Sequence, residues 1–171
     1  QGTVGKEITE QLKEINTIPD IYLCCVSGGG LIAGSSFYLK SNFPQIESYS
    51  VEPENFNDTR LSLKQNYIVS NKNNKSSICD ALLVTQPGEI TFKINQTTLE
   101  AGLDVSDQEV KKTIKILAET LKVKVEPGGA VAAAALLSQK IKVKNKTVVV
   151  MISGGNIDQD LFSQIVTENY E

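Results

Sequence analysis

The sequence predicts an α/β protein in which a mostly parallel β-sheet lies between two layers of helices. Two apolar runs, at residues 21–26 and 146–152, have the length and composition of strands buried on both faces. Between them, apolar residues recur every three or four positions, which is the period of a helix with one buried side. A short turn rich in glycine follows each run. Strands that alternate with helices in this way favour a three-layer sandwich.

The first half of the chain is expected to begin with a helix at residues 5–15, because Ile8, Leu12 and Ile15 share one helical face. The remaining elements follow in order: a strand at 21–26, a glycine turn at 27–30, a helix at 31–41, a weakly alternating strand at 48–52, a short helix at 58–65, a polar surface loop at 66–75, an ambiguous segment at 88–98 and a short strand at 103–105.

The second half contains the clearest helix start in the chain. Ser106 and Glu109 have the spacing of a capping box, and the apolar stripe behind them continues to Leu121. Pro127 opens another helix that runs to residue 137. The strand at 146–152, a turn at 153–156 and a helix at 160–167 complete the chain. Since no repeat and no Pro- or Gly-rich linker divides the 171 residues, we expect a single domain, 1–171.

Composition excludes several kinds of chemistry and partner. The sequence has no histidine, which rules out a Ser-His-Asp triad, a Cys-His pair and an HExxH zinc site. A net charge of −3 gives no reason to expect nucleic acid or an anionic membrane as a partner, and the apolar runs are too short to span a bilayer. The three cysteines, Cys24, Cys25 and Cys79, are interpreted as small buried hydrophobic residues, which suits a reducing compartment and a cytoplasmic location.

The glycine turns are the features that indicate function. The turn Ser27-Gly28-Gly29-Gly30 lies between a predicted strand and a helix, where backbone N–H groups and the helix dipole attract an anion such as a phosphate. It is not a Walker A loop, because no Lys-Ser/Thr follows. A tight turn that needs glycine only for packing is the alternative. A second turn at 153–156 and a third at 126–129 are expected at the same edge of the sheet.

Together these segments resemble a known enzyme family. The resemblance is carried by Val-Ser-Gly-Gly-Gly-Leu-Ile-Ala-Gly (26–34), Val-Glu-Pro-Glu (51–54), Ser-Ile-Cys-Asp-Ala-Leu (77–82), Val-Ser-Asp-Gln-Glu-Val (105–110), Val-Glu-Pro-Gly-Gly-Ala (125–130) and Ser-Gly-Gly-Asn (153–156). They are similar to fold-type II pyridoxal-phosphate enzymes, in the subgroup of serine/threonine dehydratases and serine racemases. The resemblance implies the large domain of the tryptophan synthase beta-like fold.

The resemblance also implies that these 171 residues form the carboxyl-terminal half of such an enzyme, a partial cofactor-binding domain. The family's Ser-x-Lys-x-Arg-Gly motif, whose lysine forms the Schiff base with the cofactor, does not occur in this sequence. No catalytic residue is therefore assigned, and the chain alone is expected to be inactive. The complete enzyme is expected to be a homodimer.

Site residues are carried over position by position. The resemblance assigns the cofactor phosphate to Ser27, Gly28, Gly29, Gly30 and Leu31, the pyridine nitrogen to Ser153, and a place beside the ring to Glu126. Glu52, the carbonyl of Phe56 and Asp58 match the divalent-cation site of racemase-type members, and their oxygen ligands suit Mg²⁺ or Ca²⁺. An ordinary charged loop is the alternative for the two carboxylates, and an ordinary carboxylate at the start of a helix is the alternative for Glu126.

The implied activity is removal of water and then ammonia from L-threonine or L-serine, which gives a 2-oxo acid. Serine racemisation and 3-hydroxyaspartate dehydration remain open, because the motifs do not separate them. A hypothesis from a different functional class is a non-catalytic module that binds a phosphorylated ligand through Ser27, Gly28, Gly29, Gly30 and Leu31.

Overall fold

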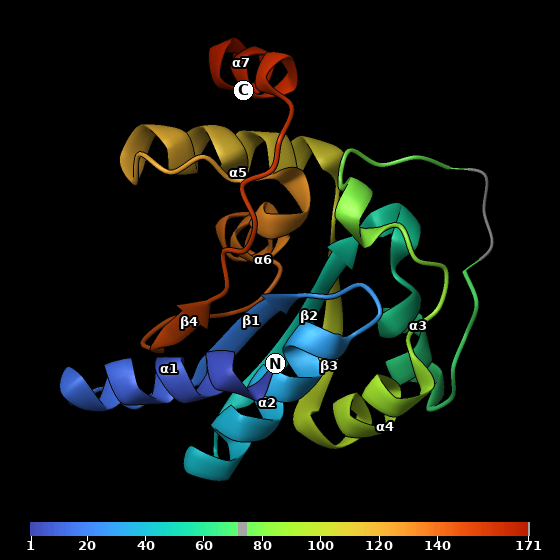
Figure 1. The fold of residues 1–171 in the computed structure, drawn as a ribbon, viewed down its shortest axis with the longest axis vertical. Helices are drawn as coiled ribbons and strands as arrows, with labels where there is room; N and C mark the ends of the chain where they lie inside the picture. Colours follow the sequence, from blue (N-terminus) through green and yellow to red (C-terminus); the bar gives the residue numbers. More distant parts are fainter. Residues whose placement is uncertain (72–74, 171) are drawn as a thin grey trace.

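The computed structural model describes residues 1–71 and 75–170. Their helices and strands alternate as the sequence predicts (Figure 1). The elements are α1 (Gly2–Glu14), β1 (Ile21–Cys25), α2 (Gly30–Asn42), β2 (Glu47–Pro53), the 3₁₀ turn η1 (Glu54–Phe56), α3 (Asp58–Gln65), the 3₁₀ turn η2 (Asp80–Leu82), α4 (Glu89–Thr98), β3 (Leu99–Val105), α5 (Asp107–Thr120), α6 (Pro127–Leu137), β4 (Val148–Val150) and α7 (Gln159–Thr167).

The four strands form one parallel sheet in the order β3-β2-β1-β4. Every residue of β1 is buried, as its continuous apolar run predicts. The predicted strand at 146–152 differs from expectation, because β4 has three residues and all are only half-buried. The reason is its place at the edge of the sheet, with β1 as its neighbour on one side. Its apolar composition alone does not distinguish an edge strand from a central one.

Two further differences concern the middle of the chain. The ambiguous segment at 88–98 is the helix α4, and β3 begins at Leu99 rather than at residue 103. Gly102 interrupts the apolar pattern that would predict the full length of β3. Glycine is needed there because an added Cβ would lie 2.6 Å from the Cα of Arg60 on α3. A glycine inside a strand often marks such a close approach of two backbones. The predicted loop at 66–75 contains no helix or strand in its described parts, while residues 72–74 lie outside the described residues.

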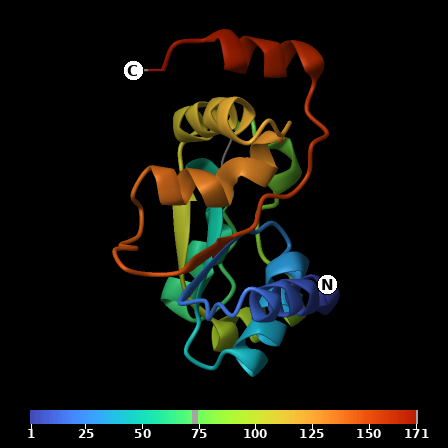
Figure 2. The ribbon, with the colours of Figure 1, turned by 90° about the vertical axis from the view of Figure 1, so that its left-hand side faces the viewer.

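Helices cover both faces of the sheet, which confirms the three-layer arrangement. On one side α2 packs against β1 and is itself flanked by α1 and α4; on the other, α6 packs against β1, β2 and β3 and carries α5. Figure 2 shows α7, at the carboxyl end, lying beyond α5 and away from the sheet. None of the described helices is long and apolar enough to cross a membrane.

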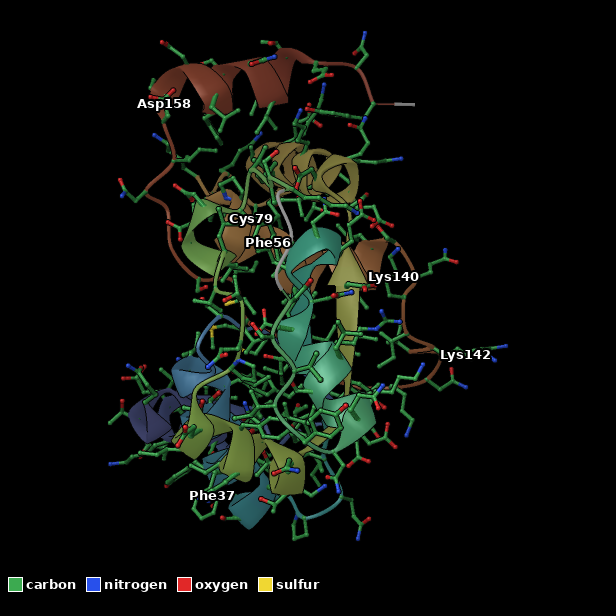
Figure 3. All side chains as sticks on the ribbon, turned by 90° about the vertical axis from the view of Figure 1, so that its right-hand side faces the viewer. Phe37, Phe56, Cys79, Lys140, Lys142 and Asp158 are labelled. Carbon is green, nitrogen blue, oxygen red and sulfur yellow. The ribbon has the colours of Figure 1, made fainter. Side chains whose placement is uncertain are left out.

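The core lies between the sheet and these helices. Figure 3 shows Phe56 and Cys79 in the interior, whereas Phe37 lies at the outside of α2. All three cysteines are buried and form no disulfide, as expected from the sequence. One apolar surface remains open, because Ile8 and Leu12 of α1, Ile15 directly after this helix, and residues 149–152 line a groove of about 400 Å³ beside the edge strand β4.

Candidate functional site

The glycine turn after β1 has the backbone geometry of an anion site. Gly29 adopts a left-handed conformation with φ of +93°, and α2 begins immediately afterwards at Gly30 with no side chain capping its first turn. The first N–H groups of a helix have no partner within the helix, so they are available to a ligand. An added Cβ at Gly28 or Gly30 would meet nothing within 4 Å, which leaves open space above the turn.

A pocket of about 190 Å³ adjoins this turn. Its walls are residues 25–31 and Leu82. The pocket therefore contains all five residues that the sequence assigns to the cofactor phosphate. Free N–H groups, the positive end of a helix dipole and open space together fit a phosphate group.

Contacts from the start of α4 support the first glycine turn, and the sequence alone does not predict this support. Thr91 donates a hydrogen bond to the carbonyl oxygen of Gly28 at 2.5 Å, and the backbone N–H of Gly88 donates to the same oxygen at 3.2 Å. An added Cβ at Gly29 would lie 2.8 Å from Thr91 Oγ1 and 3.0 Å from Asn95 Nδ2. These contacts explain why glycine is needed at position 29, in addition to its positive φ. The signal in the sequence was Pro87-Gly88 before a helix of ambiguous pattern.

Ser153 lies beside the end of β1. Its hydroxyl oxygen is 3.2 Å from the Sγ of Cys25, which lines the pocket beside the first glycine turn. The N–H of Ser153 donates to the carbonyl oxygen of Gly129 on α6 at 3.3 Å. Gly129 packs directly against the Ser153 carbonyl, so a side chain at position 129 has no room. The structure thus places the second glycine turn beside the end of β1, which leads into the first turn, and fixes the second turn against the start of α6.

Glu126 completes this group as the N-cap residue of α6. Its carboxylate accepts a hydrogen bond from the backbone N–H of Asn156 at 2.9 Å and lies against Gly154. The N–H of Glu126 donates to the carbonyl oxygen of Gly154 at 3.3 Å. Gly154 has φ of +70°, a conformation that side-chain-bearing residues rarely adopt. The third glycine turn therefore holds the second one in place.

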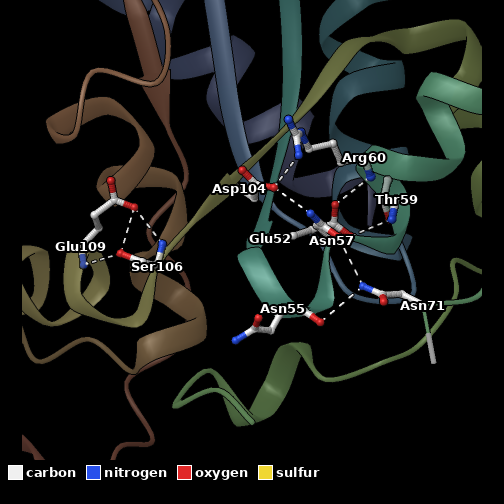
Figure 4. A network of polar contacts seen from close by, with 9 residues as sticks. All are labelled: Glu52, Asn55, Asn57, Thr59, Arg60, Asn71, Asp104, Ser106 and Glu109. Carbon is white, nitrogen blue, oxygen red and sulfur yellow. Dashed lines mark hydrogen bonds and ion pairs between the residues drawn. The ribbon is translucent and has the colours of Figure 1, made fainter. Parts of the chain in front are cut away.

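The two carboxylates of the predicted cation site are buried together between β2 and α3. Glu52 accepts hydrogen bonds from the N–H groups of Thr59 and Arg60, both at 2.8 Å (Figure 4). Both carboxylate oxygens of Asp58 are buried and have no hydrogen-bond partner among the described residues. Phe56 lies between them in sequence, on η1, with its side chain in the core.

Burial disfavours the charged form of both carboxylates. It raises the pKa of Asp58 from 3.8 to about 7. Burial, together with the nearby charge of Asp58, also raises the pKa of Glu52 well above its usual value. A divalent cation would relieve this unfavourable charge, so the oxygen donors fit a hard cation. In the described part of the chain no group of three His, Cys, Asp or Glu side chains gathers around a metal position, so a backbone carbonyl would have to contribute.

Comparison with known proteins agrees with this geometry. Residues 1–154 match the family described as "Pyridoxal-phosphate dependent enzyme". The chain belongs to this family. The resemblance in the sequence is therefore confirmed, as is the parallel α/β fold that it implies.

Three relatives illustrate which proteins this chain is similar to. The L-threonine ammonia-lyase of Thermotoga maritima is 34% identical over 168 residues, which cover 98% of this chain and 40% of the relative. The serine racemase of Schizosaccharomyces pombe is also 34% identical over 168 residues, covering 98% of this chain and 50% of that protein. Among solved structures, the processed form of threonine deaminase isoform 2 from Solanum lycopersicum superposes with a TM-score of 0.84 at 31% identity, over 96% of this chain and 44% of the other. This member of the pyridoxal-phosphate family thus spans about half the length of its relatives.

Proposed function

We propose that this chain is the carboxyl-terminal half of a pyridoxal-phosphate-dependent ammonia-lyase that acts on a β-hydroxy amino acid. The observation that carries the proposal is the convergence of the open glycine turn, its pocket and Ser153 at one edge of the sheet. When bound, pyridoxal phosphate supplies an electron sink for bond breaking next to the amino group of the substrate. The residues of this chain would hold the group and set its electronic character.

Each residue would have a separate role. The N–H groups of residues 27–31 bind the phosphate, and the hydroxyl of Ser27 adds a donor. Ser153 donates a hydrogen bond to the ring nitrogen. Because a hydroxyl is neutral, it does not keep that nitrogen protonated as a carboxylate would, and this favours prompt loss of the β-hydroxyl group. Glu126 holds the turn that carries Ser153 and would lie beside the ring.

Racemisation of serine remains the second candidate, since one of the relatives described above is a serine racemase at the same identity as the ammonia-lyase. Dehydration of 3-hydroxyaspartate is a third. Assay of the complete protein with L-threonine, L-serine and L-threo-3-hydroxyaspartate separates these reactions. A 2-oxo acid from threonine as the main product supports the proposal, whereas D-serine as the main product would replace it with the racemase.

The cofactor-binding part of the proposal can be tested on this chain directly. Pyridoxine 5′-phosphate is a suitable probe, because it has the ring and the phosphate but no aldehyde that reacts with lysines. Ser27→Asp places a negative charge at the phosphate position and should abolish binding measured by calorimetry. Ser41→Asp is the matched control, since Ser41 is exposed in the last turn of α2, the helix that follows the glycine turn. Equal binding by both variants would refute the phosphate site, and with it both the enzyme and the non-catalytic binding module.

The cation site is a further part of the proposal. Glu52, Asp58 and the carbonyl oxygen of Phe56 would bind Mg²⁺ or Ca²⁺, supported by the unpaired buried oxygens of Asp58. A cation there would connect the end of β2 to the start of α3. The homodimer stays a prediction of the resemblance, and the cytoplasmic location stays a prediction from the cysteines.

A further inference from the structure

Cys25 occupies a position that the proposed function does not explain. It is the last residue of β1 and a wall of the pocket, and its Sγ lies 3.2 Å from the hydroxyl oxygen of Ser153. Side chains alternate along a strand, so Cys24 points to the opposite face. There Tyr22, two residues away, donates to Ser35 of α2 at 2.9 Å. The two neighbouring cysteines therefore have different surroundings, and Cys25 is the one at the site.

The direction of the hydrogen bond between Cys25 and Ser153 decides what Ser153 can do. A serine hydroxyl has one proton to donate and two lone pairs. If that proton points to the sulfur, only lone pairs face the ring nitrogen of a bound ligand. If the thiol of Cys25 donates instead, the hydroxyl proton is free to point to the nitrogen. A neutral pyridine nitrogen is an acceptor, so the second arrangement is the productive one.

We propose that Cys25 is a positioning residue: its thiol donates to Ser153 Oγ and directs the hydroxyl proton of Ser153 toward the ring nitrogen of a pyridoxal-type ligand. This inference rests on the proposed function. It adds the residue that sets the hydroxyl's direction, which neither the glycine turns nor the resemblance assigns.

The charged and titratable groups around Cys25 make this arrangement sensitive to pH. The hydrogen bond with Cys24 and, less strongly, the one with Ser153 lower the pKa of Cys25 to about 7, against opposing effects of burial and of the nearby Glu126. Tyr22 and Cys79 are the other titratable neighbours, and burial raises the pKa of each. Above this pKa the thiolate accepts the Ser153 proton and the nitrogen loses its donor. Binding that depends on the ring nitrogen should therefore weaken as the pH rises through about 7.

The test compares three variants with pyridoxine 5′-phosphate as the probe. Cys25→Val removes the donor and should weaken binding about three- to tenfold, the effect of one hydrogen bond. Cys25→Ser keeps a donor and should restore the affinity and remove the pH dependence near 7, because a serine does not ionise there. Cys24→Val is the matched control on the opposite face and should leave the affinity below pH 7 unchanged. Because the hydrogen bond with Cys24 is the main effect that lowers the pKa of Cys25, the loss of affinity should move to a higher pH in this variant. The near-ultraviolet band of the bound ring, which responds to hydrogen bonding at the nitrogen, should shift in Cys25→Val alone.

Two further measurements make the result decisive. In a Ser153→Ala background, Cys25→Val should have no additional effect, since Cys25 acts through Ser153. The affinity for inorganic phosphate should be equal in wild type and all variants, because phosphate has no ring nitrogen. Equal affinity and an equal spectrum for wild type and Cys25→Val would overturn the inference while leaving the proposed function in place. Failure of the wild type to bind pyridoxine 5′-phosphate would overturn both.

Discussion

Replacement of Gly154 by alanine tests how the site is held together. Gly154 has φ of +70°, which costs an alanine about 1–2 kcal/mol. The new Cβ would also overlap the Glu126 carboxylate and displace it from the N–H of Asn156, a loss of about 1 kcal/mol for one exposed hydrogen bond. The sum is about 2–3 kcal/mol of unfolding free energy. At about 2–4 °C per kcal/mol for a chain of this size, the melting temperature should fall by about 4–12 °C.

Urea denaturation followed by circular dichroism measures this difference, with Gly128→Ala as the matched control. Gly128 lies in the first turn of α6, where an added Cβ comes no closer than 3.2 Å, to a side-chain atom of Leu82. Alanine favours a helix over glycine by about 1 kcal/mol, so the control should unfold within about 1 kcal/mol of wild type. Because Ser153 precedes Gly154, only Gly154→Ala should also weaken binding of pyridoxine 5′-phosphate. A stability loss below about 0.5 kcal/mol for Gly154→Ala would refute the reasoning.

Four other predictions address the cation site, a helix cap, the pH dependence of Glu109 and catalysis. At a concentration about ten times its Kd, Mg²⁺ or Ca²⁺ should raise the unfolding free energy by about 1.4 kcal/mol. Thermal melts should show this stabilisation in wild type and in the control Glu54→Gln, but not in Asp58→Asn. Stabilisation that Asp58→Asn retains would exclude the site. Ser106→Ala should cost about 1 kcal/mol in urea denaturation, because Ser106 Oγ accepts from the N–H of Glu109 at 3.2 Å in a complete capping box (Figure 4). Burial opposes the shift, but the hydrogen bond with Lys140 and those with Ser106 lower the pKa of Glu109 below 4.5. The contribution of Glu109 to the unfolding free energy is therefore present above this pH and should be lost as the pH falls further. A stability difference between wild type and Glu109→Gln that stays constant down to acid pH would contradict this. The 171-residue chain alone should convert no threonine in a 2-oxo-acid assay, and turnover together with one borohydride-trapped lysine would show that the catalytic lysine lies within it.

The helices were predictable where local chemistry determines them. The capping box at Ser106 and the proline at the start of α6 appear in the structure as the sequence indicates. Regions that depend on tertiary contacts were less predictable. The full length of β3 is concealed by Gly102, whose role is to let α3 approach closely, and an edge position such as that of β4 cannot be inferred from apolar composition.

The same distinction applies to the site. Glycine turns after strands predicted where Ser27 and Ser153 lie, because parallel strands end at the same edge of a sheet. The partners that hold these turns come from distant segments. Thr91 supports the first turn across 63 positions of sequence, and Cys25 contacts Ser153 across 128. The sequence indicates only a buried apolar role for Cys25, and its burial is confirmed, but its hydrogen bond to Ser153 depends on the folded chain.

The central claim is that the glycine turn and Ser153 form one site for a pyridoxal-type phosphate. Amide NMR spectra of this chain during titration with pyridoxine 5′-phosphate test it most directly. We expect saturable shifts at the N–H groups of residues 27–31, at Ser153 and at Gly154, and shifts at 27–31 but not at Ser153 when inorganic phosphate replaces the probe. Shifts confined to the groove between α1 and β4, or no saturable shift at residues 27–31, would contradict the account.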